Sequence, residues 1–160
     1  MDAYPYRVFQ PFLELNRALI DASTIIYMYR AGYFDKVARA VDLYSLPEIL
    51  AETGHGDLHV KPIDWVATSG ANDRKLVSCA LGLRWPVISE DKKILLRLER
   101  VGIPYFNALM MLHFLLFRKS ITLKDHSMHL RRLKQCAWYS RHVLEFGKNI
   151  YNAILCQEMR

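Results

Sequence analysis

Two kinds of hydrophobic pattern follow one another along the chain. Short apolar runs at residues 17–21, 44–46, 86–89 and 103–106 are typical of strands buried on both faces. A weaker run within residues 58–66 predicts a further strand. Because each run is only a few residues long, these segments predict short strands in a sheet that is covered by helices.

Between these runs, apolar residues recur at the three- and four-residue spacing of a helix facing a core. Ser23 or Thr24 is expected to cap the first helix, which Gly32 ends. Pro47 suits the first turn of a later helix, and Gly54 ends that one. Further helices are predicted at residues 34–41, from 72 or 73 to 83, after Asp91 to 101, and at 108–117, 123–135 and 138–155.

Alternating strands and helices predict an α/β fold with a mostly parallel central sheet and helices on both of its faces. The 160 residues suffice for one domain with a substantial core. We assign residues 17–160 to that domain, with the helices at about 122–155 as a C-terminal addition. Residues 1–16 are expected to form an extension before the first strand.

Two acidic residues directly follow predicted strands. Asp21 interrupts the apolar stretch RALIDASTIIY, and Asp91 comes directly after the run that ends at Ser89. An unpaired charge inside a buried strand is costly, so each acid is expected where a strand ends and a helix begins. Since parallel strands bring their carboxyl ends to one edge of a sheet, both side chains are predicted to point into the same crevice.

Glu52 and Asp73 are the other candidates for this crevice, and Glu90 is a fifth acid beside Asp91. Two full charges about 5 Å apart at an effective dielectric of about 20 repel by about 3 kcal/mol, so such a cluster needs something to offset it. Mg²⁺ or Mn²⁺ does this, because hard cations prefer oxygen ligands. Such an ion activates water for phosphodiester hydrolysis.

Each of these further acids also has a purely structural interpretation. Asp73 stands where a carboxylate caps a helix or complements its dipole. Glu48, one turn before Glu52, is an alternative inward-facing acid. Glu90 either joins the cluster or faces water.

The charge is unevenly distributed. Residues 1–80 carry 8 Lys or Arg against 10 Asp or Glu, a net −2, whereas residues 81–160 carry 14 against 6, a net +8. An acidic cluster beside a basic surface suits a metal-dependent enzyme acting on a polyanion, although a basic surface also simply favours solubility. Three widely spaced cysteines and the absence of a signal-peptide pattern or a long apolar segment indicate a cytoplasmic protein without a membrane anchor.

Arg131, Arg132 and Lys134 form a basic cluster. They are candidates for phosphate contacts with a nucleic acid, and the alternative is a solvated helix face. Trp138 and nearby tyrosines, Tyr139 and Tyr151, are expected to pack in the interior rather than to stack on bases.

Two histidine pairs have the spacing of metal ligands. His55 and His59 are four residues apart, and His126 and His129 are three apart. Neither pair has cysteine partners or a HExxH context, so a zinc site is not expected.

The four acids stand in sequence contexts that resemble the PIN domain family. The resemblance lies in LIDAST around Asp21, Glu52 five residues after Pro47, Asp73 opening a helix, VISEDKKIL around Asp91, and the segment RLERVGIPYFNALMMLHFLLFRKSIT. It covers about residues 17–135.

The resemblance implies a three-layer α/β/α nuclease fold, usually acting on RNA and found in VapC-type toxins. By this resemblance, Asp21, Glu52, Asp73 and Asp91 are catalytic metal ligands, Glu90 is an auxiliary acid, and Ser23 supports the first acid. An antitoxin and a second copy of the chain are the protein partners that it implies.

Three functional hypotheses follow. The first is a magnesium- or manganese-dependent ribonuclease, with the toxin of a toxin–antitoxin pair as its specific form. The second is a PIN-fold module that binds RNA or protein without cleavage. The third is a phosphohydrolase on another α/β scaffold.

Overall fold

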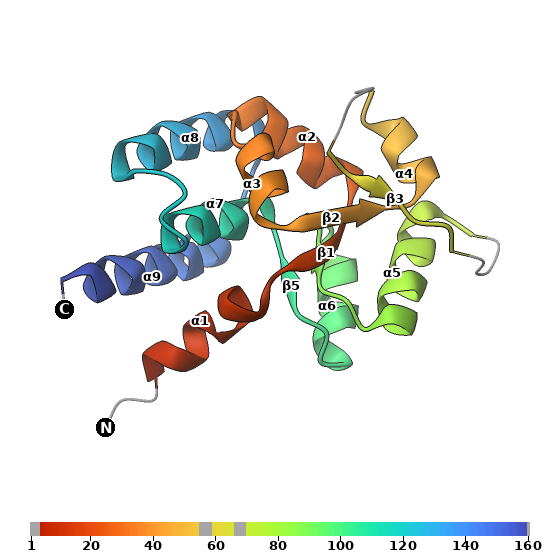
Figure 1. The fold of residues 1–160 in the computed structure, drawn as a ribbon, viewed down its shortest axis with the longest axis horizontal. Coiled ribbons are helices and arrows are strands. Elements are labelled where there is room, and N and C mark those ends of the chain that lie inside the picture. Colours follow the sequence, from red (N-terminus) through yellow and green to blue (C-terminus); the bar gives the residue numbers. More distant parts are fainter. Residues whose placement is uncertain (1–3, 55–58, 66–69, 160) are drawn as a thin grey trace.

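The computed structural model of the chain describes residues 4–54, 59–65 and 70–159. Within them, helices and strands alternate as the hydrophobic pattern predicts (Figure 1). The strands are β1 (Arg17–Ile20), β2 (Asp42–Ser45), β3 (Lys61–Pro62), β4 (Val87–Ile88) and β5 (Tyr105–Phe106). The helices are α1 (Tyr4–Glu14), α2 (Ala22–Ala31), α3 (Phe34–Ala40), α4 (Pro47–Glu52), α5 (Asn72–Leu83), α6 (Lys92–Arg100), α7 (Ala108–Phe117), α8 (Leu123–Cys136) and α9 (Arg141–Glu158).

The strands form one sheet in the order β3-β2-β1-β4-β5, and every neighbouring pair is parallel. The predicted α/β class with a mostly parallel sheet is therefore confirmed. Strand β1 lies in the middle, where Leu19 pairs with Tyr44 of β2 on one side and Val87 of β4 on the other. This register brings the carboxyl ends of β1 and β4 next to each other.

Alternate residues of the strands enter two separate cores. Ala18 and Ile20 of β1 belong to the larger core, whereas Leu19 between them belongs to the smaller one. The smaller core includes residues of α4, α5 and α6, and the larger one includes residues of the other helices. Figure 1 shows α5 and α6 on one side of the sheet and α7, α8 and α9 gathered on the other. Helices thus cover both faces, which explains why the strands are continuous apolar runs.

The predicted N-terminal extension is largely a helix that is part of the core. Phe9 and Phe12 of α1 are fully buried. The Phe9 ring lies 4.9 Å, centroid to centroid, from that of Phe117, and the Phe12 ring lies 5.6 Å from that of Phe114. Because both partners belong to α7, the aromatic side chains of α1 hold this helix against the far end of α7.

The start of the last helix differs from the prediction. Residues 138–155 were expected to be helical, but α9 begins at Arg141 because the Ser140 hydroxyl accepts a hydrogen bond from the Val143 amide and caps the helix. Trp138 therefore lies in the connection between α8 and α9, where its side chain is 87% exposed. The expectation that Trp138 packs in the interior is wrong.

Helix α7 is the centre of the larger core, and it carries one buried polar side chain. His113 is enclosed, and its Nδ1 lies 3.0 Å from Nε2 of His126 in α8. At this distance the N–H group of one ring donates a hydrogen bond to the unprotonated nitrogen of the other. Two fully protonated rings would place N–H against N–H. Burial lowers the pKa of His113 to about 3, with a further contribution from His126, and burial lowers the pKa of His126 to about 4. The pair is thus neutral near pH 7.

None of the helices in the described ranges combines the length and apolarity needed to cross a membrane. The apolar helix α7 has only 10 residues, and it is surrounded by protein.

The buried histidine pair predicts a loss of stability in mild acid. Histidines of the unfolded chain take up protons near pH 6.5, whereas the folded pair resists protonation down to about pH 4. The free energy of unfolding should therefore fall as the pH drops from 7 to 5, by up to about 1.4 kcal/mol per pH unit for each histidine. Urea unfolding at both pH values measures this loss.

The variant His113→Gln should show a smaller loss between pH 7 and pH 5, because one buried titratable group is gone. His142→Gln, at an exposed position of α9, is the matched control. An equal change of pH dependence in both variants would contradict the role given to the buried pair.

Candidate functional site

The site lies at the carboxyl edge of the sheet, where β1 and β4 end side by side. The Asp21 amide donates a hydrogen bond of 3.0 Å to the carbonyl of Ile88, so the pairing of the two strands continues into the first acidic residue. On the other side of β1, the Ser45 hydroxyl donates to the Ile20 carbonyl at 2.7 Å. The backbone that carries Asp21 is therefore fixed from both neighbouring strands.

Asp21 lies at the junction of β1 and α2 as predicted, but it is itself the N-cap of α2. The expectation that Ser23 or Thr24 caps this helix is wrong, because both residues lie inside its first turn. Oδ1 of Asp21 accepts a hydrogen bond from the Ala22 amide at 2.8 Å, and its Oδ2 accepts one from the Ser89 hydroxyl at 3.1 Å. Only 8% of the residue is exposed. Burial raises the pKa of Asp21, the two hydrogen bonds lower it, and the charges of Asp73 and Glu52 raise it further.

Ser89 joins the two strand-end acids. Besides donating to Asp21, its Oγ accepts a hydrogen bond from the Asp91 amide at 3.1 Å. Asp91 in turn caps α6, since its Oδ1 accepts from the Lys93 amide at 2.8 Å. Ser89 was not among the residues predicted for the site, although its position directly after an apolar run and two residues before Asp91 was a usable signal.

Glu52 and Asp73 approach from the other side of the crevice. The side chain of Asn72, at the start of α5, donates a hydrogen bond to Oε1 of Glu52 at the end of α4. Ala71 occupies the N-cap position of α5, so the Asp73 carboxylate is not used as that helix's cap. Glu48, the alternative inward acid, lies instead 3.9 Å from the Lys75 ammonium on the protein surface. These contacts favour Glu52 and Asp73 as members of the site.

Glu90 is anchored by a hydrogen bond from a different helix. Its Oε1 accepts a hydrogen bond of 2.7 Å from the Ala108 amide at the start of α7. The buried hydroxyls of Thr24 and Tyr139 lie near this carboxyl group, but neither completes a hydrogen bond of normal geometry within the described part of the chain. Burial raises the pKa of Glu90 against the opposing effect of the hydrogen bond from the Ala108 amide. Glu90 thus faces protein as much as it faces the crevice.

An open hollow of about 380 Å³ collects these side chains. It is lined by Asp21, Ala22, Ser23, Glu52, Asp73, Glu90 and Asp91. All five acids proposed for the site from the sequence therefore border one cavity, together with Ser23. Among the described residues, no Lys, Arg or His lines it, so the hollow is strongly negative.

The donor chemistry of the hollow suits a hard divalent cation, because its ligand atoms are carboxylate and hydroxyl oxygens. The side chains are nevertheless spread around the hollow. Within the ranges that the structure describes, no three acidic, histidine or cysteine side chains lie close enough together to hold a metal ion as they stand. Binding an ion there would require Glu52, Asp73 and Asp91 to turn inward toward Asp21, which their partly exposed positions leave room for.

The candidate nucleic-acid residues do not form one patch. Arg131 and Arg132 are exposed on α8, and the Arg132 guanidinium lies beside Gly32 at the end of α2. Lys134 lies on the other side of α8 from Arg132, where it lines a groove toward α9, whereas Arg131 precedes Lys134 by three residues and shares its side of the helix. Only part of the predicted basic cluster can therefore contact one ligand at a time.

The histidine pairs also separate in the structure. His126 contacts His113, whereas Nδ1 of His129 lies 2.8 Å from the carbonyl of Ala31. His59 is described, and its predicted partner His55 lies outside the described residues. The spacing of His126 and His129 thus reflects two separate packing contacts.

Comparison of the chain with models of protein families, with curated proteins and with solved structures gave no match. Function is therefore inferred from the residues of the site.

The hydroxyl of Ser89 should control the ionisation of Asp21. In Ser89→Ala, Asp21 loses a hydrogen bond to its charged form, so its pKa should rise above the already raised value. The Asp91 amide also loses its partner, and the free energy of unfolding should fall by about 1–3 kcal/mol. Carboxyl ¹³C NMR titration and urea unfolding measure the two effects.

Ser45→Ala is the matched control, because Ser45 is also fully buried and donates to a backbone carbonyl of β1. It should lower stability without changing the titration of Asp21. If the two variants moved the Asp21 titration equally, the Ser89 contact would have no specific role.

Proposed function

We propose that this protein is a metal-dependent ribonuclease of the PIN type, hydrolysing phosphodiester bonds at the acidic hollow. The observation that carries the proposal is the convergence of Asp21, Glu52, Asp73 and Asp91 on one cavity at the carboxyl ends of β1 and β4. These residues come from four separate segments of the chain, and the helix caps formed by Asp21 and Asp91 do not explain why Glu52 and Asp73 border the same cavity.

Asp21, Glu52, Asp73 and Asp91 would hold Mg²⁺ or Mn²⁺, with Asp21 as the fixed ligand at the base of the hollow. When bound, such an ion neutralises the phosphate, lowers the pKa of a water molecule and stabilises the charge of the transition state. The chain itself orients Asp21 through Ala22 and Ser89, and orients Glu52 through Asn72. Glu90 is a positioning residue, because its carboxyl group anchors the start of α7 at the rim of the site.

Single-stranded RNA is the substrate we propose, since the connection between α8 and α9 carries an exposed aromatic side chain between cations and reaches the hollow through Tyr139. Trp138 is 87% exposed, and its neighbour Tyr139 has its hydroxyl near Glu90. Lys134 and Arg141 stand on either side of Trp138 in the sequence. Proteins that bind single strands combine cations along the backbone with aromatic rings on which bases stack.

A non-cleaving PIN-fold module is the second candidate, and one observation favours it. The carboxylates line the hollow without being drawn to a common point in the described structure. A protein that uses the hollow only for binding would keep them apart in the presence of divalent ions as well. The roles of an antitoxin, a toxin function and a homodimer rest on the resemblance alone.

Cleavage of single-stranded RNA should require Mg²⁺ or Mn²⁺ and should depend on the strand-end acids. Asp21→Asn and Asp91→Asn should each lower the cleavage rate by about a hundredfold or more, because each removes a charged ligand while keeping the side-chain shape. Gel analysis of a labelled oligonucleotide measures the rate. Asp35→Asn, at an exposed acid in the first turn of α3, is the control and should cleave normally.

A substrate-free readout separates the two candidate functions. Millimolar Mn²⁺ should raise the melting temperature of the wild type by mass action, and should do so less in Asp21→Asn than in Asp35→Asn. Metal stabilisation without cleavage would favour the binding module. A wild-type melting temperature indifferent to Mn²⁺, together with cleavage unaffected by chelator, would remove the metal site altogether.

Trp138 should contribute to RNA affinity independently of cleavage. In chelator, Trp138→Ala should bind a single-stranded oligonucleotide about tenfold more weakly, as expected for the loss of one stacked base. Trp138→Phe should retain most of the affinity. Phe146→Ala removes another exposed aromatic ring, 54% exposed on α9, and is the control. Equal affinity of Trp138→Ala and wild type would exclude the stacking role.

A further inference from the structure

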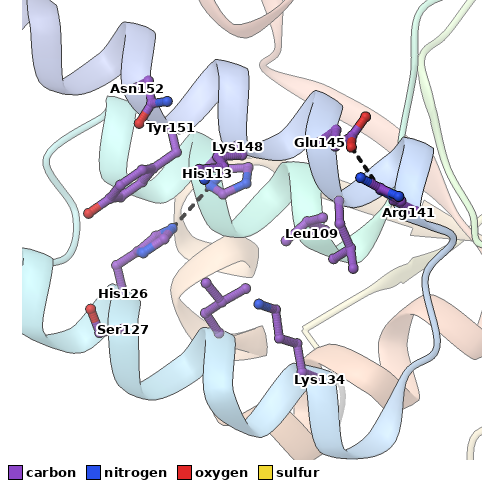
Figure 2. Close-up of a pocket in the computed structure, with 12 residues that line it drawn as sticks. Leu109, His113, His126, Ser127, Lys134, Arg141, Glu145, Lys148, Tyr151 and Asn152 are labelled. Carbon is purple, nitrogen blue, oxygen red and sulfur yellow. Dashed lines mark hydrogen bonds and ion pairs between the residues drawn. The ribbon is translucent and has the colours of Figure 1, made fainter.

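A second cavity lies among the C-terminal helices, between α8 and α9 with α7 beneath them (Figure 2). Its volume is about 560 Å³, and it shares no lining residue with the acidic hollow. We call it the α8–α9 groove. Ligand pockets of this size accept molecules of drug-like dimensions. The proposed nuclease function uses two cations of its rim, Lys134 and Arg141, but gives its apolar floor no role.

The floor of the groove is apolar and rigid. It is formed by Leu109 of α7, Leu130 of α8 and Leu144 of α9. Gly147 lets α9 lie directly on α7, since a Cβ atom there would be 3.0 Å from a methyl group of Leu109 and 3.1 Å from His113 Nε2. A side chain at this position would require Leu109 or His113 to shift by a few tenths of an ångström, so Gly147 permits the close packing of α9 on α7 below the groove.

One end of the groove is an uncharged aromatic wall. The rings of His126 and Tyr151 stack with centroids 5.0 Å apart and planes inclined by 22°. His126 is held by its hydrogen bond to His113, which Figure 2 shows as a dashed line. The wall is therefore built before any ligand arrives.

The rim of the groove is positively charged. Lys134 from α8 and Arg141 and Lys148 from α9 line it, and Figure 2 shows the Lys134 ammonium group directed from α8 into the groove. The one acid in the lining, Glu145, accepts a hydrogen bond from Arg141 at 3.1 Å. After this pairing, Lys134 and Lys148 remain as cations on facing helices.

From this combination we propose that the α8–α9 groove binds a small organic anion with an apolar body, such as a medium-chain carboxylate. The apolar body lies on the three leucines, and the anionic group lies between Lys134 and Lys148. Inorganic phosphate would leave the apolar floor uncovered, and an apolar cation would be repelled by both lysines. The apolar floor and the cationic rim together select a molecule that carries both features.

The test uses the full chain and decanoate as the probe, with decan-1-ol as the uncharged counterpart. Methyl NMR spectra follow the signals of Leu130 and Leu144 during titration. We expect saturable shifts with decanoate at concentrations where decan-1-ol gives smaller or no shifts. Lys134→Gln combined with Lys148→Gln should weaken decanoate binding several-fold, whereas Lys124→Gln, at an exposed position early in α8, should not.

Three results would overturn the proposal. The first is decanoate and decan-1-ol binding with equal affinity, which would show that the lysines select nothing. The second is no response to decanoate combined with shifts of the same leucines on adding a single-stranded oligonucleotide, which would assign the groove to RNA. The third is a dimer in sedimentation analysis that buries these leucines, which would make the groove an interface between copies.

Discussion

The parallel register of β1 and β4 is the constraint on which the rest of the site depends. It places Ile20 beside Ile88 and continues into the hydrogen bond from the Asp21 amide to the Ile88 carbonyl. A shift of one residue would turn Asp21 toward the opposite face of the sheet and into a hydrophobic core. The alternation of Ala18, Leu19 and Ile20 between two cores prevents that shift, because each side chain already fits its own side. The apolar packing of the strand therefore determines where the buried carboxylate points.

This arrangement places a carboxylate where its charged form is unfavourable, and the local structure offsets only part of the cost. Burial and the charges of Asp73 and Glu52 favour the protonated form of Asp21, whereas the Ala22 amide and the Ser89 hydroxyl favour the ionised form. The balance still raises the pKa. A fold selected for stability alone would replace one of these acids by an amide or an apolar residue. A bound cation would offset the cost of keeping these acids together. This is the physical reason for proposing that the site depends on a metal.

The sequence was sufficient to predict features that depend on local spacing. The positions of Asp21 and Asp91 between buried strands and helices, the class of the sheet and the extent of α7 all follow from short-range patterns. Which side chain caps α2 did not follow from them, since Ser23 or Thr24 was expected and Asp21 is the cap. Contacts made through tertiary packing could not be predicted in this way. The hydrogen bond from Ser89 to Asp21 joins residues 68 positions apart, and Glu90 accepts one from an amide 18 positions away. Trp138 was misplaced because an apolar residue beside a helical pattern was counted with the helix, whereas the Ser140 cap excludes it.

Helix α7 links the two cavities in a single rigid element. Its first amide, at Ala108, binds Glu90 at the acidic hollow, and the next residue, Leu109, already lies in the floor of the α8–α9 groove. The helix is buried along most of its length, and Phe9 and Phe12 of α1 hold its far end. Since an enclosed helix moves as a unit, a ligand that displaced α7 in the groove would also shift the Ala108 amide away from Glu90. The rim of the acidic hollow is thus mechanically continuous with the groove, although the two cavities share no side chain.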